Sequence, residues 1–279
     1  MLRYTLVLSV ILITSCNSSN SSEIKVQKTI TQISKELLNN PSDTVLLIVH
    51  QKKSVPGHIG HLFKERGYKF DRRCPCLGDE LPEELDRYAA VVIFGGPMSA
   101  NDCWMPGIKK ELDFVPRVLK AEIPFLGLCL GGQILARVLG GDVKPHADGH
   151  IESGYTRIYP TEAGRDWFLD SNIFYQWHRE GFDTPSTATL IARGDIFPNQ
   201  AFIYNKCAIA TQFHPEITRD MIDRWTMHGA HRLNRPGAQP RQAHIKGWEL
   251  FSERIDLWGK SLLDRFQLFG SQAKVIVNE

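Results

Sequence analysis

The sequence predicts an α/β protein with an open, mostly parallel sheet flanked by helices. Two observations support this prediction. Continuous apolar runs at residues 44–50, 89–94 and 123–128 have the composition of strands that are buried on both faces. Each run is followed by a segment in which apolar residues recur at helical spacing. Strand and helix signals that alternate in this way indicate parallel strands joined by crossover helices.

The predicted helices that follow these strands occupy residues 59–67, 108–119 and 133–139. Pro116 falls inside the second helix, and we expect it to bend or split that helix because proline lacks a backbone N–H. The third helix is closed by Gly140-Gly141, a common helix end.

The pattern changes after residue 155 to short β runs, which we expect to form a small antiparallel addition. These runs lie at residues 155–159, 173–177, 189–192 and 201–204. An apolar strand at 208–211 precedes a helical pattern at 217–227, a basic, Gly- and Pro-rich loop at 229–241 and a helix at 248–268. The predicted main domain therefore covers residues 44–225, followed by a C-terminal loop and helical extension over residues 226–279.

The first 16 residues have the layout of a signal peptide, with Arg3 before an apolar run that is shorter than the roughly 20 residues of a transmembrane helix. Ile13-Thr14-Ser15-Cys16 resembles the bacterial lipobox, whose cysteine becomes lipidated. We therefore predict a membrane-anchored lipoprotein that faces the periplasm or the cell exterior. The alternative is a mischosen start codon and a cytoplasmic protein. Residues 17–43 are expected to form a polar tether and a short leader helix.

Composition excludes several other classes of protein. The chain has 33 basic and 31 acidic residues, and this net charge of +2 gives no electrostatic footprint for nucleic acid. Six irregularly spaced cysteines are too few for a disulfide scaffold. His228, His231 and His244 have no cysteine or carboxylate at recurring ligand spacing, so we predict no metal and no cofactor.

Cys129 is the candidate nucleophile, within Gly127-Leu-Cys-Leu-Gly-Gly-Gln133 at a predicted strand-to-helix turn. A tight turn of this type raises a nucleophile above the sheet, and the following helix N-terminus stabilises negative charge. A buried cysteine in a Gly-rich turn and a phosphate-binding loop are the alternative interpretations. His214 and Glu216, after the strand at 208–211, supply a candidate base and a carboxylate to orient it.

An oxyanion formed at Cys129 also needs hydrogen-bond donors. The backbone N–H of Leu130, the residue after the nucleophile, is one candidate, and the N–H of Gly96 at the end of the second strand is the other. The alternative interpretation of Gly95-Gly96-Pro97 is a simple turn.

With these pieces together, the sequence resembles the class I (triad) glutamine amidotransferases, in particular the stand-alone group similar to the amidotransferase domain of GMP synthetase. The matching stretches are Phe94–Ala100, Gly127–Gln133, Gln176–His178, Pro198–Phe202 and Gln212–Glu216. The resemblance implies a flavodoxin-like amidotransferase fold, Cys129 as nucleophile with His214 and Glu216, and an oxyanion hole at Gly96 and Leu130. It also implies that Gln133 lies at the glutamine pocket.

A substrate contact for His178 is a further hypothesis. The related group tends to have an aspartate two residues after this histidine, whereas this sequence has Glu180. The alternative is a packed histidine at a strand end.

The predicted function is hydrolysis of the γ-amide of glutamine or of γ-glutamyl compounds through a γ-glutamyl thioester. The predicted partner is thus a small molecule. One alternative is a glutaminase subunit that delivers ammonia to a separate synthetase, which gains weight if the chain is cytoplasmic. Another is a catalytically silent surface lipoprotein, and the intact Cys129, His214 and Glu216 count against it.

Overall fold

The computed structural model describes residues 43–205 and 207–272 of the chain. The predicted signal peptide, the lipidation site Cys16 and the leader helix between residues 17 and 43 lie outside these ranges. None of the helices in the described ranges combines the length and the apolar sequence that a membrane span requires.

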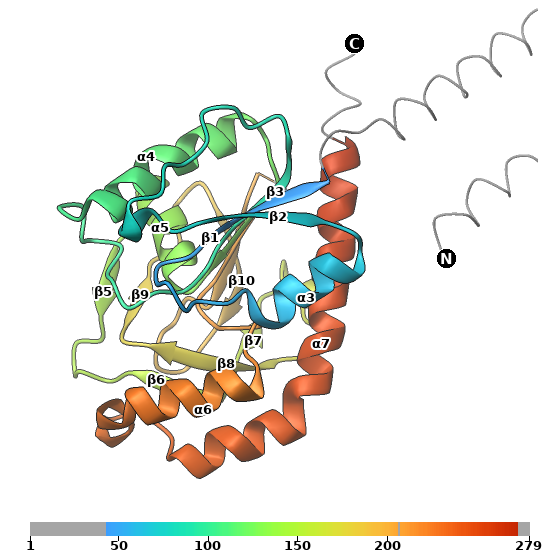
Figure 1. The fold of residues 1–279 in the computed structure, drawn as a ribbon. Coiled ribbons are helices and arrows are strands. Elements are labelled where there is room, and N and C mark those ends of the chain that lie inside the picture. The colour runs from blue at the N-terminus through green and yellow to red at the C-terminus, as the bar shows by residue number, and fades with distance from the viewer. Residues whose placement is uncertain (1–42, 206, 273–279) are drawn as a thin grey trace, which may run out of the picture. The chain divides into compact units, whose positions relative to one another are not determined.

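The main sheet has eight strands within the described residues, in the order β2-β1-β3-β4-β12-β11-β10-β7 (Figure 1). Its first five strands in this order are parallel, and the last three pair antiparallel. The parallel strands are β2 (Lys69–Arg73), β1 (Thr44–Ile48), β3 (Tyr88–Ile93), β4 (Phe125–Leu128) and β12 (Ala208–Thr211). The antiparallel strands are β11 (Ala201–Tyr204), β10 (Thr189–Arg193) and β7 (Tyr159–Pro160).

Two small antiparallel pairs stand apart from the main sheet. They are β5 (Val143–Pro145) with β9 (Glu180–Phe182), and β6 (Glu152–Arg157) with β8 (Ile173–His178). The described residues also form three short 3-10 helices. They are η1 (Pro75–Leu77), η2 (Arg165–Trp167) and η3 (Ala230–Asn234).

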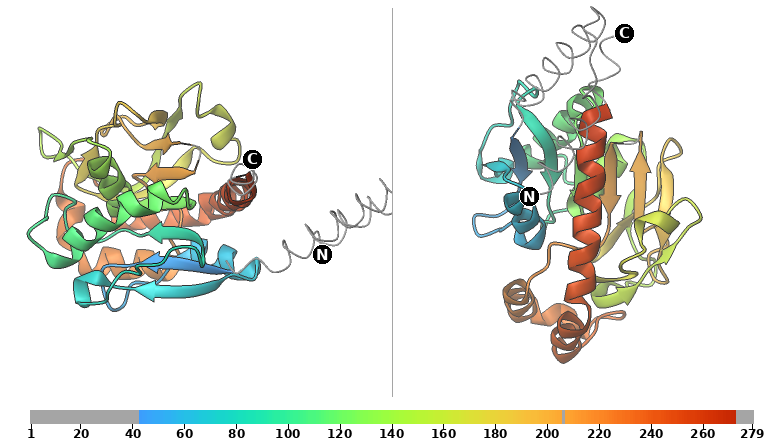
Figure 2. Two further views of the ribbon diagram at one scale, coloured as in Figure 1. Left: turned by 90° about the horizontal axis from the view of Figure 1, so that it is seen from above. Right: turned by 90° about the vertical axis from the view of Figure 1, so that its right-hand side faces the viewer.

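Helices cover both faces of the main sheet (Figures 1 and 2). One apolar core lies beneath α3 (Gly57–Glu65), α6 (Arg219–His228) and α7 (Arg241–Gln272). A second core lies beneath α4 (Pro106–Lys120) and α5 (Leu130–Val138). The alternation of side chains along β1 feeds both cores, because Val45 and Leu47 belong to the first and Leu46 and Ile48 to the second.

The predicted fold class is confirmed, including the antiparallel β addition and the C-terminal helix. Of the two effects expected of Pro116, a bend or a split, the split does not occur, since α4 runs without interruption from Pro106 to Lys120. The apolar side of α4, with Ile108, Phe114 and Val118 fully or almost fully buried, packs on the sheet and offsets the missing hydrogen bond.

The sequence analysis also missed β2, whose residues Lys-Phe-Asp-Arg-Arg do not form an apolar run. It lies at the sheet edge and pairs only with β1 among the described strands. An edge strand tolerates charged side chains that a central strand does not. The last helix also starts earlier than predicted, at Arg241, which shortens the basic loop.

Candidate active site

Cys129 occupies the turn between β4 and α5, at the carboxyl edge of the parallel strands. Its backbone has φ 50° and ψ −104°, a conformation that L-residues rarely adopt. Neighbouring strand β12 supports this turn, because the Cys129 N–H donates to the Thr211 carbonyl over 2.8 Å. A Cβ on Gly131 would lie 2.1 Å from the Ile93 carbonyl oxygen, so only glycine lets α5 approach the sheet this closely. The turn is therefore strained and held by its surroundings, as expected of a nucleophile elbow.

His214 follows β12 and is paired with Glu216, as the sequence analysis predicted. The His214 Nδ1 and the Glu216 Oε1 are 2.8 Å apart, and both side chains are buried. Burial lowers the pKa of His214, but the charges of Glu216 and Cys129 outweigh this effect and raise the pKa to about 10. Within the described residues His214 Nε2 makes no hydrogen bond of normal geometry, and interaction with the Cys129 side chain contributes to the raised pKa of the ring.

Gly95 and Gly96 follow β3 and pack against Cys129, His214 and Leu130. A Cβ on Gly95 would lie 2.7 Å from His214 Cε1 and 3.5 Å from Cys129 Cβ, while one on Gly96 would lie 2.8 Å from Leu130 Cδ2. The two predicted oxyanion donors, Gly96 and Leu130, are thus neighbours. Leu130 is the first residue of α5, where backbone N–H groups have no partner inside the helix.

A buried pair that the sequence analysis missed lies behind these glycines. The His50 Nδ1 is 3.1 Å from the Gly95 carbonyl oxygen, and its Nε2 is 3.1 Å from Glu111 Oε2. Burial lowers the pKa of His50, but the Glu111 carboxylate raises it by more, which favours an imidazolium that donates from both nitrogens. The available signal was the position of His50, a polar residue at the end of the apolar run over residues 44–50.

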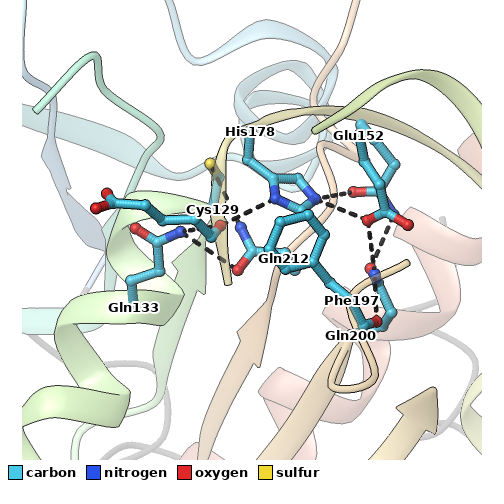
Figure 3. Close-up of polar contacts among 9 residues, drawn as sticks. Cys129, Gln133, Glu152, His178, Phe197, Gln200 and Gln212 are labelled. Carbon is cyan, nitrogen blue, oxygen red and sulfur yellow. Dashed lines mark hydrogen bonds and ion pairs between the residues drawn. The ribbon is translucent and has the colours of Figure 1, made fainter. Parts of the chain in front are cut away.

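Gln133 lies in the first turns of α5 and connects Cys129 to β9. Its Nε2 donates to the Glu180 carbonyl over 2.8 Å and to Gln212 Oε1 over 3.3 Å, and Gln212 Nε2 is 3.7 Å from Cys129 Sγ (Figure 3). Gln133 is buried, and the side chain of Gln212 links it to the Cys129 thiol. A contact between Gln133 and the substrate stays a prediction.

His178 ends β8 and belongs to a second buried histidine–carboxylate pair. Its Nε2 is 2.9 Å from Glu152 Oε2, and its Nδ1 is 2.9 Å from the Glu180 carbonyl oxygen that Gln133 also contacts (Figure 3). Gln200 Nε2 donates to the same Glu152 oxygen over 2.8 Å. The sequence analysis did not identify Glu152, because its partner His178 lies on a strand much later in the sequence.

One group of three side chains could approach a metal ion. The ligand atoms of His146, Asp148 and His150 lie within 4.8 Å of one another. Ligands of tetrahedral zinc, at 2.0–2.1 Å from the ion, lie about 3.3 Å from one another. Asp148 is exposed, and the group is too open as it stands to be assigned a metal.

The α/β fold agrees with the comparisons with known proteins. The chain belongs to the class I glutamine amidotransferase family, whose model matches residues 48–224. The family supports hydrolysis of the glutamine amide as the general activity, with glutamine as the small-molecule substrate. The resemblance stated from the sequence is therefore confirmed.

Three known proteins are similar to this chain over most of their own length. The glutamine amidotransferase-like protein YfeJ of Salmonella typhimurium is 25% identical over 82% of this chain and 99% of its own. A subunit of the glutamine-hydrolysing GMP synthase from Sulfolobus acidocaldarius is 31% identical over 58% of this chain and 85% of its own. A solved glutamine amidotransferase from Thermotoga maritima has a TM-score of 0.72 and 31% identity, over 80% of this chain and 97% of its own.

Proposed function

We propose that the protein hydrolyses the γ-amide of glutamine or of a γ-glutamyl compound through a thioester on Cys129. The observation that carries this proposal is the strained Cys129 turn beside a buried His214–Glu216 pair. An imidazolium next to a thiol stabilises the thiolate, which is the nucleophilic form. The match of residues 48–224 to the family model supports a glutamine amide as the substrate.

The proposed reaction proceeds in two halves. The Cys129 thiolate attacks the γ-carbonyl carbon, and the backbone N–H groups of Leu130 and Gly96 stabilise the oxyanion. His214 Nε2 gives its proton to the leaving nitrogen, so that ammonia or an amine departs and a γ-glutamyl thioester remains. His214 then takes a proton from water, which attacks the thioester and releases glutamate and the thiolate. Glu216 keeps the ring oriented throughout and stabilises its positive charge whenever the ring is protonated.

Replacement of the nucleophile tests this mechanism. Cys129→Ala is expected to lower glutamate release from glutamine by at least about a thousandfold, because the covalent route is lost. Cys103→Ala, which replaces an exposed free cysteine, is the matched control and should keep parent activity. Mass spectrometry of the parent quenched during turnover should show a γ-glutamyl adduct on the peptide that contains Cys129. Equal rates in Cys129→Ala and the parent would exclude the thiol mechanism.

A second candidate function is delivery of ammonia to a separate synthetase. It is favoured by the similarity to the GMP synthase polypeptide of Sulfolobus acidocaldarius. In that case the isolated chain should release glutamate slowly until a synthetase is added. Rapid release by the isolated chain favours the free-standing hydrolase, and no release under either condition favours a silent protein.

A lipid-anchored location in the cell is a separate proposal, and it rests on residues 1–16 alone. Lipidation of Cys16 should place the mature chain in the membrane fraction, with its first residue diacylated. Cys16→Ala should remove the lipid, as measured by the mass of the N-terminal peptide. An intact N-terminus in the soluble cytoplasmic fraction of parent-expressing cells would rule out the lipoprotein and favour the mischosen start.

A further inference from the structure

A pocket rich in positive charge opens beside the Gln133–His178 network. We call it the basic pocket, and its polar lining comprises Glu152, Ser153, His178, Arg179, His231, Arg232 and Arg235. Arg179 lies between β8 and β9, whereas His231, Arg232 and Arg235 come from η3 and the residue after it. The C-terminal segment therefore supplies three of these seven polar residues.

Arg232 is the arginine whose guanidinium is most enclosed in the basic pocket. It is half-buried and lies over the Trp177 ring, with 5.9 Å between Cζ and the ring centroid. Its guanidinium has no hydrogen bond or carboxylate partner among the described residues, and burial together with the charges of Arg179 and Arg235 lowers its pKa. A half-buried guanidinium among like charges is stabilised when an external anion binds to it.

The acidic residue in the pocket does not neutralise Arg232. Glu152 Oε2 already accepts from Gln200 Nε2 over 2.8 Å and lies 2.9 Å from His178 Nε2. The Glu152 side chain is also almost fully buried, so its charge is committed to this network. A net positive potential remains for a ligand.

The basic pocket is linked to the nucleophile by a chain of hydrogen bonds. Gln212 Nε2 is 3.7 Å from Cys129 Sγ, and Gln212 Oε1 accepts from Gln133 Nε2 over 3.3 Å. His178, which lines the pocket, shares the Glu180 carbonyl with Gln133. A substrate held at Cys129 can therefore extend into the pocket.

The origin of the arginines indicates which part of a substrate they contact. Residues 231–235 lie beyond residues 48–224, which match the family model. The family reaction on glutamine releases ammonia, and ammonia needs no charged pocket. An anionic group on a larger leaving amine would give a role to these arginines, of which Arg179 lies within the matched residues and Arg232 and Arg235 lie beyond them.

We propose that the basic pocket binds a carboxylate on the leaving amine, so that the preferred substrates are γ-glutamyl amino acids rather than glutamine. This rests on the proposed function of Cys129 and specifies its substrate class. The scissile bond remains the γ-glutamyl amide, and the departing amine takes its proton from His214. Arg232 provides the charge-assisted hydrogen bonds to the carboxylate.

The experiment compares two substrates that differ in one charge. γ-Glutamyl-glycine carries a carboxylate on its leaving amine, and γ-glutamyl-glycinamide is its neutral counterpart. The parent should show a higher kcat/KM for γ-glutamyl-glycine, and Arg232→Gln should reduce this preference by about ten- to a hundredfold. Arg232→Lys should retain part of it. Arg224→Gln, an exposed arginine on α6 outside the pocket, is the matched control and should leave the preference unchanged.

Three outcomes would overturn the proposal. An unchanged preference in Arg232→Gln would show that Arg232 does not bind the carboxylate of the leaving amine. Glutamine hydrolysis by the same preparation would show that the proposed function still stands. An equal loss on γ-glutamyl-glycine, its amide and glutamine shows that Arg232 binds the carboxylate of the γ-glutamyl half. Failure of the folded parent to hydrolyse any of the three compounds removes both the proposed function and this substrate class.

Discussion

Buried histidine–glutamate pairs recur around the cysteine turn, each linked to it by a few contacts. The pairs are His50–Glu111, His178–Glu152 and His214–Glu216, and every side chain in them is at most 3% exposed. Burial of a charged pair costs about as much free energy as its attraction returns. Such pairs are therefore better explained by the positions they fix than by the stability they add. His50 fixes the Gly95 carbonyl, and His178 fixes the Glu180 carbonyl.

Removing the Glu216 charge is expected to lower the pKa of His214. Burial alone would lower this pKa below 6.5, and the Glu216 and Cys129 charges raise it to about 10. A histidine with a raised pKa stabilises the folded state below about pH 6.5, and this contribution is lost as the pH rises through about 10. Between these values, the free energy of unfolding should therefore fall more steeply with pH in the parent than in Glu216→Gln.

Urea unfolding across this pH range measures the difference in slope. Glu84→Gln, at an exposed carboxylate outside the described ion pairs, is the control and should follow the parent. We also expect Glu216→Gln to lower kcat by about 10²- to 10⁴-fold, since the ring loses its orienting partner. Parallel slopes for Glu216→Gln and the parent would contradict the assigned ion pair.

At the scale of elements, an aromatic cluster around Trp258 is a major contact between α7 and the rest of the domain. Trp258 is almost fully buried, stacks on Phe168 with 6.0 Å between ring centroids, and donates from Nε1 to the Trp167 carbonyl over 2.7 Å. Phe174 and Phe213 contact the same indole ring. The helix therefore completes the core on one face of the sheet.

Trp258→Ala should lower the free energy of unfolding by about 3–5 kcal/mol, because it leaves a cavity between α7 and the sheet. Leu257→Ala, one position earlier on the same helix, is a matched control because Leu257 is 48% exposed. It should cost less than about 1 kcal/mol. Denaturant unfolding followed by fluorescence at the remaining tryptophans provides the measurement. A similar loss in both variants would mean that α7 is held by something other than this cluster.

At the scale of the whole molecule, the sequence predicted what depends on local pattern. The runs that became β1, β3 and β4 are apolar because both faces of the sheet are covered, and the Cys129 and His214 motifs follow strands that end at one edge. The polar edge strand β2 gave no such signal, and tertiary packing outweighed the proline in α4. Propensity alone decides neither case.

The remaining site residues could not be predicted, because their meaning depends on contacts across the chain. His50 and Glu111 are 61 positions apart, and Glu152 and His178 are 26 apart. Neither glutamate differs in its local sequence from an exposed helix or strand residue. Arg232 and Arg235 of the basic pocket lie in a segment predicted only as a basic loop. The position of Arg232 over Trp177 depends on how η3 packs, which the local sequence does not specify.

The hydrogen bond from the Cys129 N–H to the Thr211 carbonyl bears on the order in which the chain folds. Gln212, beside that carbonyl, is separated from Cys129 by 83 positions, and every strand from β5 to β11 lies between them. Contacts over such a separation form late, because the intervening chain must lose its entropy first. During synthesis, therefore, the cysteine emerges long before the strand that supports its strained turn and the histidine that activates it. The growing chain carries an ordinary thiol until β12 docks, and reactivity begins only when the domain is complete.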